Sequence, residues 1–379
     1  MLFGEFFTQR RKNMYLFYAL LLLIPMFFLR KRTAESGEIL DAKSTTCLKG
    51  LLCFFVMLHN LGLDLPGNTV IKERICEYSG GIGVGLFFFL SAFGIIRSYQ
   101  RKGNGYLKRL LLVHIPKLYL ISVGINLLTY FVFFQGAYET GDLLMRIFNL
   151  DFFNGFQGMN RHGWYIASII TMYLVFALVY FVCSKLKTEK RFMIAGIVLA
   201  FLAIAFRLTA IIADEGRMYT RELPTFAIGC IYATFYQKIN EWAKKFFWAG
   251  LFICIPLFIL GFIIKTEAIS TYTAAVLIIL VSQKCTYYNR VGFFFGKICI
   301  GVYLFLYFST LAFGLGTPYM DMYNDYWWVL LNAGFIIELS VLLYGVEYVI
   351  TKGIRFLADR RLSGKEIKER TALTETKNN

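Results

Sequence analysis

The sequence is poor in charge, in proline and in histidine. Charged residues make up only 17% of the 379 residues, and the chain has six prolines and three histidines. A typical soluble domain is about one quarter charged and at most about half apolar. Here 58% of the residues are hydrophobic and the mean hydropathy is +0.57. These values exclude an ordinary soluble protein and favour a chain that lies largely within a membrane.

The cysteines are scattered and form no recognisable ligand set. None of the eight lies in a C-x-x-C pair, and most lie in or beside apolar runs, among them Cys47, Cys53, Cys183, Cys230 and Cys254. Zinc sites and disulfide frameworks need clustered ligands at characteristic spacings. We therefore expect buried apolar cysteines and no metal.

The net charge is strongly positive, with 40 Lys and Arg against 24 Asp and Glu. A nucleic-acid-binding protein needs a solvated basic face, for which the long apolar runs leave little room. Basic loops on one side of a bilayer explain the charge better, because cytoplasmic loops retain Lys and Arg. We expect a lipid membrane as partner and no nucleic acid.

Long apolar runs indicate an all-α fold, a polytopic transmembrane bundle of about 10–11 helices, since a span needs roughly 20 apolar residues. The candidate spans lie near 13–30, 45–63, 79–97, 110–135, 163–184, 191–212, 222–238, 243–265, 267–282, 291–315 and 327–352. The first ends in Arg30-Lys31-Arg32, unlike a cleaved signal peptide, and either spans the membrane or lies in its interface. The run 267–282 is short, and therefore either tilted or partly re-entrant.

Loop charge predicts the orientation. If 97–109 is cytoplasmic and the sides alternate, the inner segments hold 23 basic residues and the outer loops seven. The inner segments are 97–109, 185–191, 238–245, 284–297 and 352–379. We expect a multi-pass protein of the cell (plasma) membrane with a cytoplasmic C-terminus. The polar tail, 353–379, is predicted to be disordered from Asp359 onward.

Ionisable side chains within spans cost several kcal/mol and suggest function. Five of them stand out: Lys49, His59, Lys117, Arg207 and Glu338. Arg207 lies near the outer end of its span, where its side chain can reach the interface. Glu338 lies near mid-membrane, so it needs a cation, with Lys49 and Arg207 as candidates, or it is protonated. Structural pairing and a catalytic or proton-relay role both fit Glu338.

The histidines are the natural groups for acid–base chemistry near neutral pH. They are His59, His114 and His162. His59 closes the second predicted span ten residues after Lys49, which puts Lys49 toward the cytoplasmic side and His59 toward the outer side. A histidine at a membrane interface is the structural alternative. The glycines at 80, 81, 83 and 85 open the next span, and we interpret them as close helix packing and not as a dinucleotide fingerprint.

Several stretches, taken in order, carry a family resemblance. They are T-T-C-L-K-G-L-L-C-F-F-V-M-L-H-N (45–60), G-V-G-L-F-F-F-L-S-A-F-G-I (83–95), Y-L-K-R-L-L-L-V-H-I-P-K-L-Y (106–119), H-G-W-Y-I-A-S-I-I-T-M-Y (162–173) and R-E-L-P-T-F-A-I-G (221–229). Together they resemble the acyltransferase-3 family of membrane O-acyltransferases. The resemblance implies an acyltransferase-3-like transmembrane domain over 45–352, preceded by a hydrophobic segment and basic loop over 1–44.

One departure concerns the histidine of the first stretch. The family places ten residues between its basic residue and its presumed catalytic histidine, whereas nine separate Lys49 from His59. Asn60 therefore occupies the usual histidine position, and one residue turns a helix by about 100°. Either His59 reaches the site from a shifted register, or this chain has lost catalysis.

The resemblance implies transfer of an acyl group, commonly acetyl, from cytoplasmic acyl-CoA to a hydroxyl of a surface or lipid-linked glycan. It implies His59 and Lys49 as catalytic residues. Together with the charged residues singled out above, the candidate substrate-binding residues are Arg97, Arg101, Arg109, His162, Trp164, Arg221 and Glu338. Arginines suit the phosphates of coenzyme A, although a solvated positive-inside loop explains the same residues. The alternatives are a polytopic transporter or glycan flippase, with intramembrane charges as relays, or a catalytically silent protein.

Overall fold

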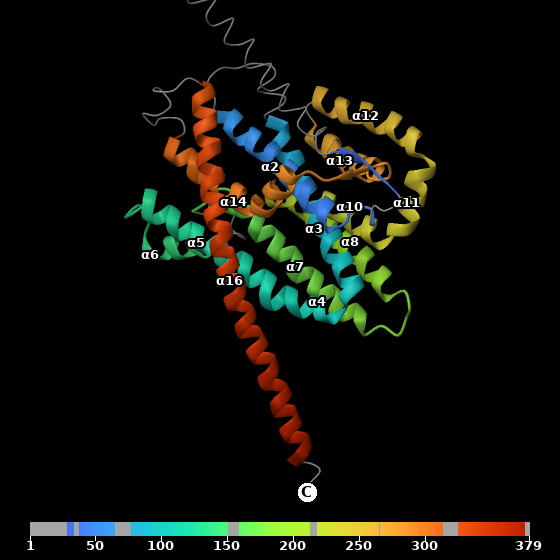
Figure 1. Cartoon of the computed structure of the whole chain (residues 1–379), viewed down its shortest axis with the longest axis vertical. Coiled ribbons are helices and arrows are strands. Elements are labelled where there is room, and N and C mark those ends of the chain that lie inside the picture. The colour runs from blue at the N-terminus through green and yellow to red at the C-terminus, as the bar shows by residue number, and fades with distance from the viewer. Residues whose placement is uncertain are drawn as a thin grey trace, which may run out of the picture.

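The computed structural model describes residues 29–33, 38–64, 77–150, 159–212, 218–264, 266–313 and 325–375. Within these ranges the chain is almost entirely helical (Figure 1). Seven of the described helices are long and apolar enough to cross a membrane, or eight if the bent pair α11–α12 forms one span. The predicted all-α, polytopic membrane bundle is confirmed.

The helices follow the predicted apolar runs in order. They are α2 (Ala42–Asp64), α3 (Glu77–Lys102), α4 (Asn104–Arg109), η2 (Leu110–His114), α5 (Ile115–Phe133), α6 (Thr140–Ile147), α7 (Gly163–Ser184), α8 (Arg191–Ile212), α9 (Met218–Arg221), α10 (Leu223–Thr234), α11 (Tyr236–Lys245), α12 (Phe247–Ile263), α13 (Glu267–Val281), α14 (Arg290–Phe313) and α16 (Asp325–Glu375). Two short strands, β1 (Leu29–Lys31) and β2 (Cys285–Tyr287), pair antiparallel.

Two predicted spans differ from the structure. The run 13–30 lies outside the described residues, apart from its last two, which belong to β1. The run 222–238 is not one helix, because α10 ends at Thr234 and a short helix, α11, follows. The axis then bends by 90° between α11 and α12. Hydropathy summed over a window does not detect such a bend, since polar residues of α11 are averaged with the apolar end of α10.

Close packing of α2, α3 and α14 forms the centre of the bundle. A Cβ atom at Gly83 would lie 2.8 Å from Val56 on α2, and one at Gly50 would lie 2.0 Å from the carbonyl oxygen of Gly292 on α14. Small residues let helix backbones approach closely in a membrane. The predicted packing role of the glycine cluster that opens α3 is confirmed.

The last helix, α16, continues to Glu375, whereas the sequence analysis predicts disorder from Asp359. Its final part is rich in Lys, Glu, Arg, Ala and Leu, which are good helix formers, so a helix can continue without a packed partner. An ion pair between Lys117 of α5 and Glu347 ties the middle of α16 to the bundle.

The antiparallel course of α2 and α3 defines two ends of the bundle. Lys49 and Arg97 lie toward one end, here called the basic end, together with β1 and β2. His59 and Gly80 lie toward the opposite end, here called the histidine end. The predicted cytoplasmic loops correspond to the basic end.

Candidate active site

His59 lies against the first turns of α3, where a glycine makes room for it. A Cβ atom at Gly80 would come within 2.4 Å of the imidazole ring of His59. Asn60 lies differently, because its Nδ2 donates a hydrogen bond of 2.8 Å to the carbonyl oxygen of Val56 on its own helix. The register of α2 therefore directs His59 toward α3, while the amide of Asn60 forms a hydrogen bond with the backbone of its own helix.

His162 immediately precedes α7 and lies close to His59. Its ring contacts two tyrosines of α14, with centroid distances of 5.5 Å to Tyr303 and 6.1 Å to Tyr307. Burial is the main cause that lowers the pKa of His162 to about 3, and the charges of His59 and Arg161 act in the same direction. His162 is thus neutral at physiological pH.

A cluster of charged residues borders the same end of the bundle. Arg221 forms ion pairs with Glu222, at 2.7 Å, and with Glu267, at 3.1 Å. Both carboxylates lie against glycines of α3, since a Cβ atom at Gly81 would overlap Glu267 and one at Gly85 would lie 2.7 Å from Glu222. The glycine-rich start of α3 therefore gives space to His59 and to both carboxylates.

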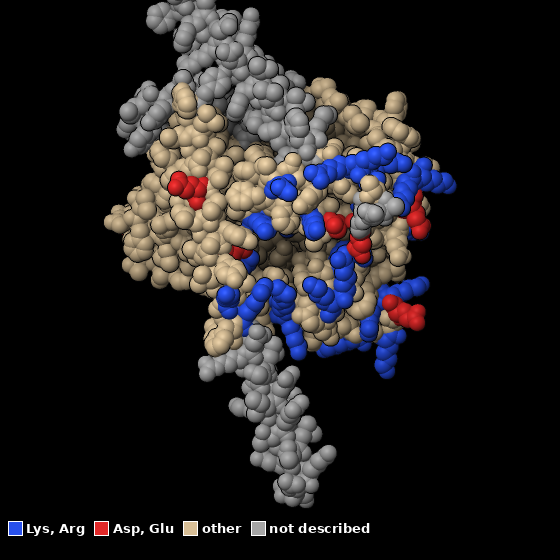
Figure 2. Space-filling model, in the orientation of Figure 1, with Lys and Arg blue, Asp and Glu red and all other residues tan. Residues whose placement is uncertain are grey.

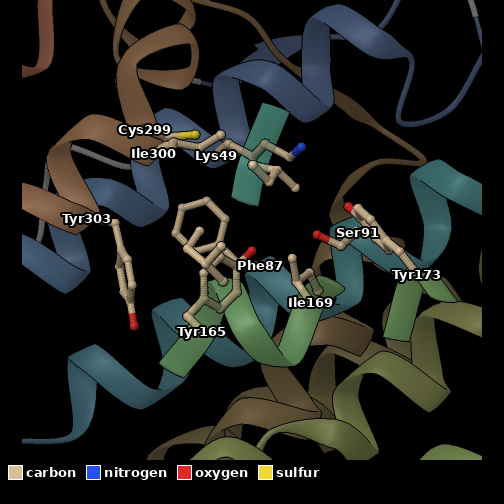
Figure 3. Close-up of a pocket in the computed structure, with 11 residues that line it drawn as sticks. Lys49, Phe87, Ser91, Tyr165, Ile169, Tyr173, Cys299, Ile300 and Tyr303 are labelled. Atoms are coloured by element: carbon tan, nitrogen blue, oxygen red, sulfur yellow. The ribbon is translucent and has the colours of Figure 1, made fainter. Parts of the chain in front are cut away.

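A narrow cavity of about 90 Å³ lies inside the bundle, between the two ends (Figure 3). Lys49 of α2 and Cys299 of α14 lie on one side of it, and Tyr165 and Tyr303 line it further along. Ser91 of α3 also lines the cavity and hydrogen-bonds with Tyr165. The interior of the bundle thus contains a mostly apolar cavity with a few polar groups on its wall.

Tyr303 connects this cavity with the histidines. Its ring lines the cavity and also contacts His162, which in turn lies close to His59. Lys49 and His59 are ten residues apart on α2, which corresponds to about 15 Å along the helix axis. A line of residues therefore leads from the ammonium group of Lys49 to the imidazole of His59.

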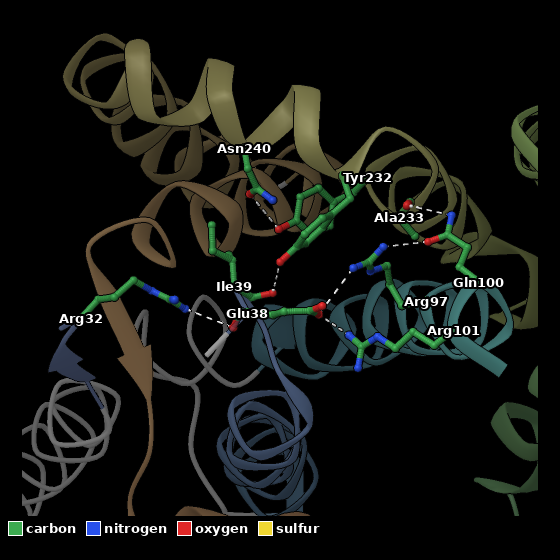
Figure 4. Close-up of polar contacts among 10 residues, drawn as sticks. Arg32, Glu38, Ile39, Arg97, Gln100, Arg101, Tyr232, Ala233 and Asn240 are labelled. Atoms are coloured by element: carbon green, nitrogen blue, oxygen red, sulfur yellow. Dashed lines mark hydrogen bonds and ion pairs between the residues drawn. The ribbon is translucent and has the colours of Figure 1, made fainter. Parts of the chain in front are cut away.

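At the basic end, Arg97 and Arg101 project from successive turns of α3 toward one carboxylate (Figure 4). Glu38 forms ion pairs with both, at 3.4 Å from Arg97. The guanidinium of Arg97 lies 4.1 Å from the ring centroid of Tyr236, and its buried Nε has no hydrogen-bond partner among the described residues. Such a stacked guanidinium is already oriented for an anion.

An open polar pocket of about 360 Å³ adjoins Arg97 and is also lined by Gln100, Tyr236 and Lys238. Figure 2 shows Lys and Arg side chains gathered around a hollow on one face of the molecule. Arg109, which follows along the chain, is exposed. The basic end therefore offers several cations to an anionic ligand.

Other predicted site residues are placed differently. Trp164 is only 8% exposed and packs in the core, whereas its neighbour Tyr165 lines the cavity. Glu338 is exposed on α16, and it has no ion pair with Lys49, Arg207 or any other described residue. Arg207 instead donates a hydrogen bond of 3.1 Å to Thr220. The structure thus separates Trp164 and Glu338 from the cavity.

Several residues that the structure brings to the cavity or to the neighbouring ion pairs were not predicted from the sequence. They are Glu38, Tyr165, Cys299, Tyr303 and Glu347. Glu347 could have been selected from the sequence, because it is an ionisable residue within the same apolar run as Glu338. The described residues contain no group of three or more His, Cys, Asp or Glu that could hold a metal ion.

The described helices form a polytopic membrane bundle with an interior cavity and histidines at one end. The acyltransferase-domain family model Acyl_transf_3 matches residues 43–345, so the chain belongs to this family of membrane acyltransferases. Comparisons with curated proteins and with solved structures gave no significant match. The family resemblance inferred from the sequence motifs is confirmed.

Proposed function

We propose that the protein transfers an acyl group, acetyl, from coenzyme A to a hydroxyl of a surface or lipid-linked glycan. The donor enters at the basic end, which we assign to the cytoplasmic side of the cell membrane, as we do the C-terminus. The acceptor binds at the histidine end. The observation that carries this proposal is the line of residues from Lys49 through the cavity to Tyr303, His162 and His59.

The shape of this passage suits a donor with a charged head and a linear arm. Arg97 and Arg101 hold the phosphates of coenzyme A, with Arg109 as a further cation nearby, because clustered guanidinium groups bind phosphate well. The extended pantetheine arm follows the narrow cavity past Lys49. The thioester then lies near the histidines, on the far side of the cavity from the nucleotide.

Transfer needs one general base at the acceptor. In the proposed step, His59 removes the proton of the acceptor hydroxyl while that oxygen attacks the thioester carbonyl carbon. The carbon–sulfur bond breaks, the proton passes from His59 to the leaving thiolate, and an ester and free coenzyme A result. Lys49 positions the donor arm. His162, Trp164 and Arg221 contact the acceptor.

The test compares two neighbouring residues of α2. His59→Ala should lower the rate of acyl transfer by about 10²–10⁴-fold, the usual effect of losing a general acid–base, without changing the membrane yield. Asn60→Ala is the matched control and should change the rate by only a few-fold, because Asn60 bonds to its own helix backbone. The assay measures transfer of radiolabelled acetyl from acetyl-CoA to membrane glycans.

The opposite pattern would refute the assignment of His59. If His59→Ala retains activity within a few-fold and Asn60→Ala loses it, the usual register operates and the position of Asn60 is the functional one. If neither variant changes transfer, His162 is the next candidate. Family membership favours group transfer over a transporter or flippase, and absence of any acetyl transfer by the wild-type protein would reopen those alternatives.

A further inference from the structure

A second concave site lies on the lipid-facing surface and shares no residue with the cavity. It is a groove of about 710 Å³ between α8, α10 and α13. Apolar residues line it almost entirely, among them Ile197, Phe201, Ile204, Ile228, Ile231 and Val276. Water is not favoured in such a groove within a bilayer, so a hydrocarbon chain is the natural occupant.

The short helix α10 produces this groove. With 12 residues, α10 extends about 18 Å, less than the roughly 30 Å of the hydrocarbon core. The groove-lining residues of α8 run from Ile197 to Ile204, a length of about 10 Å. One leaflet contributes about 15 Å of hydrocarbon. The groove therefore fits a chain that belongs to a single leaflet.

Helix α11 closes the groove at the basic end. Ile239, Trp242 and Ala243 of α11 line the groove. Because the axis bends by 90° between α11 and the apolar, lipid-exposed α12, α11 lies nearly in the membrane plane if α12 crosses the membrane. An amphipathic helix with Trp and Lys is typical of the membrane interface.

Basic side chains surround this closed end. Lys238, Lys244 and Lys245 of α11 are exposed, against a single acid, Glu241. The Lys238 ammonium lies 5.1 Å from the ring centroid of Trp242, which lines the groove. Lys245 is seven residues after Lys238 and so lies on the same side of the helix.

We propose that this groove binds one anionic phospholipid of the leaflet in which α11 lies. One acyl chain fills the space between α8, α10 and α13, and the phosphate lies beside Lys238 and Lys245. Each Lys near the interface contributes about 1 kcal/mol to binding of an anionic headgroup. The site combines a shaped apolar surface with a matching charge.

The experiment measures lipid binding to the purified full chain by native mass spectrometry and thermal stability. Phosphatidylglycerol and phosphatidylcholine with identical chains are the probes. We expect one tightly bound phosphatidylglycerol, and about 30-fold weaker binding in the double variant Lys238→Gln/Lys245→Gln. The control double variant, Lys187→Gln/Lys190→Gln, removes two exposed charges from the α7–α8 loop and should bind as wild type does.

A second pair of variants tests whether the acyl chain of the lipid occupies the groove. Ile231→Trp fills the groove from a partly exposed position and should abolish the tight binding, whereas Leu178→Trp, on the exposed face of α7, should not. If Ile231→Trp does not fold, phosphatidylglycerol with a photoactivatable chain should cross-link wild-type protein on the groove-lining segments 197–204, 224–243 and 276–280.

Several outcomes would overturn the proposal. They are equal binding of the two lipids, equal losses in both lysine pairs, unchanged binding in folded Ile231→Trp, or cross-links spread evenly over the lipid-facing helices. Lys238 also borders the pocket beside Arg97, so the readout is lipid binding and not acyl transfer. If acetyl-CoA does not bind to the protein, the result of the lipid-binding experiment is not affected.

Discussion

The ion pair between Lys117 and Glu347 allows a quantitative prediction for the attachment of α16. The two side chains are only 17% and 16% exposed and join α5 to α16 within the membrane-spanning region. Removing one partner of a buried pair leaves an uncompensated charge, which typically costs about 3–5 kcal/mol. We therefore expect Glu347→Leu and Lys117→Met each to lower the free energy of unfolding by about this amount.

The double variant should recover most of the loss, because replacing both charges by apolar groups is often nearly neutral. The free energies come from reversible unfolding in mixed micelles as the SDS fraction rises, and they form a double-mutant cycle. Glu338→Leu is the matched control on the same helix. Since Glu338 is exposed and has no described partner, this variant should change the stability by less than about 0.5 kcal/mol.

Two results would refute this reasoning. A loss below about 1 kcal/mol in Glu347→Leu would show that water reaches the pair and that it contributes as little as a surface salt bridge. A loss in Glu338→Leu as large as that in Glu347→Leu would show that α16 presents a different face to the bundle.

Three further predictions concern the donor and the topology. Cys299→Met should fill part of the 90 Å³ cavity and abolish transfer. The control Cys254→Met, on α12, should leave transfer unchanged. Normal activity of Cys299→Met would exclude the cavity as the path of the donor. Acetyl-CoA should raise the melting temperature of the purified protein. Glu38→Gln should increase the affinity of the protein for acetyl-CoA, because Glu38 competes for Arg97 and Arg101. No shift of the melting temperature at millimolar acetyl-CoA would contradict the donor site. Reporter fusions after residues 102, 187 and 365 should report the cytoplasm and those near 150 and 321 the outside, and an outside signal at 102 would reverse the orientation.

Much of the fold is predictable from hydropathy, because each described span is a long apolar run. The side that each helix presents to its neighbours is harder to predict. In a membrane the lipid-facing side is as apolar as the packed side, so hydrophobic periodicity does not identify the interior. For this reason the burial of Trp164 was not predictable, and Glu338 was expected to have a partner that the described residues do not provide.

The glycines predicted helix contacts better than the apolar residues did. The glycines that open α3 correctly indicated close approach, and they border both His59 and the carboxylates of Glu222 and Glu267. The position of Glu38 was not predictable, since it precedes the first described helix and its ion pairs join it to Arg97 and Arg101, which are far away in the sequence. The hydrogen bond from Asn60 to Val56, on which the proposal for His59 rests, was likewise not predictable from the sequence.

The packing of α2 against α14 has a consequence for biosynthesis. Cys47 contacts the backbone of Asn289 across 242 residues of sequence, and Gly50 packs on Gly292 in the same contact. At about 5–20 residues per second, translation needs about 10–50 s to deliver α14 after α2 has emerged. During this interval Lys49 and His59 reside in the translocon or the bilayer without their final neighbour. Since Cys299, Ile300 and Tyr303 of α14 line the cavity, it forms only once α14 is inserted, and a truncated chain that lacks α14 has no such enclosed cavity.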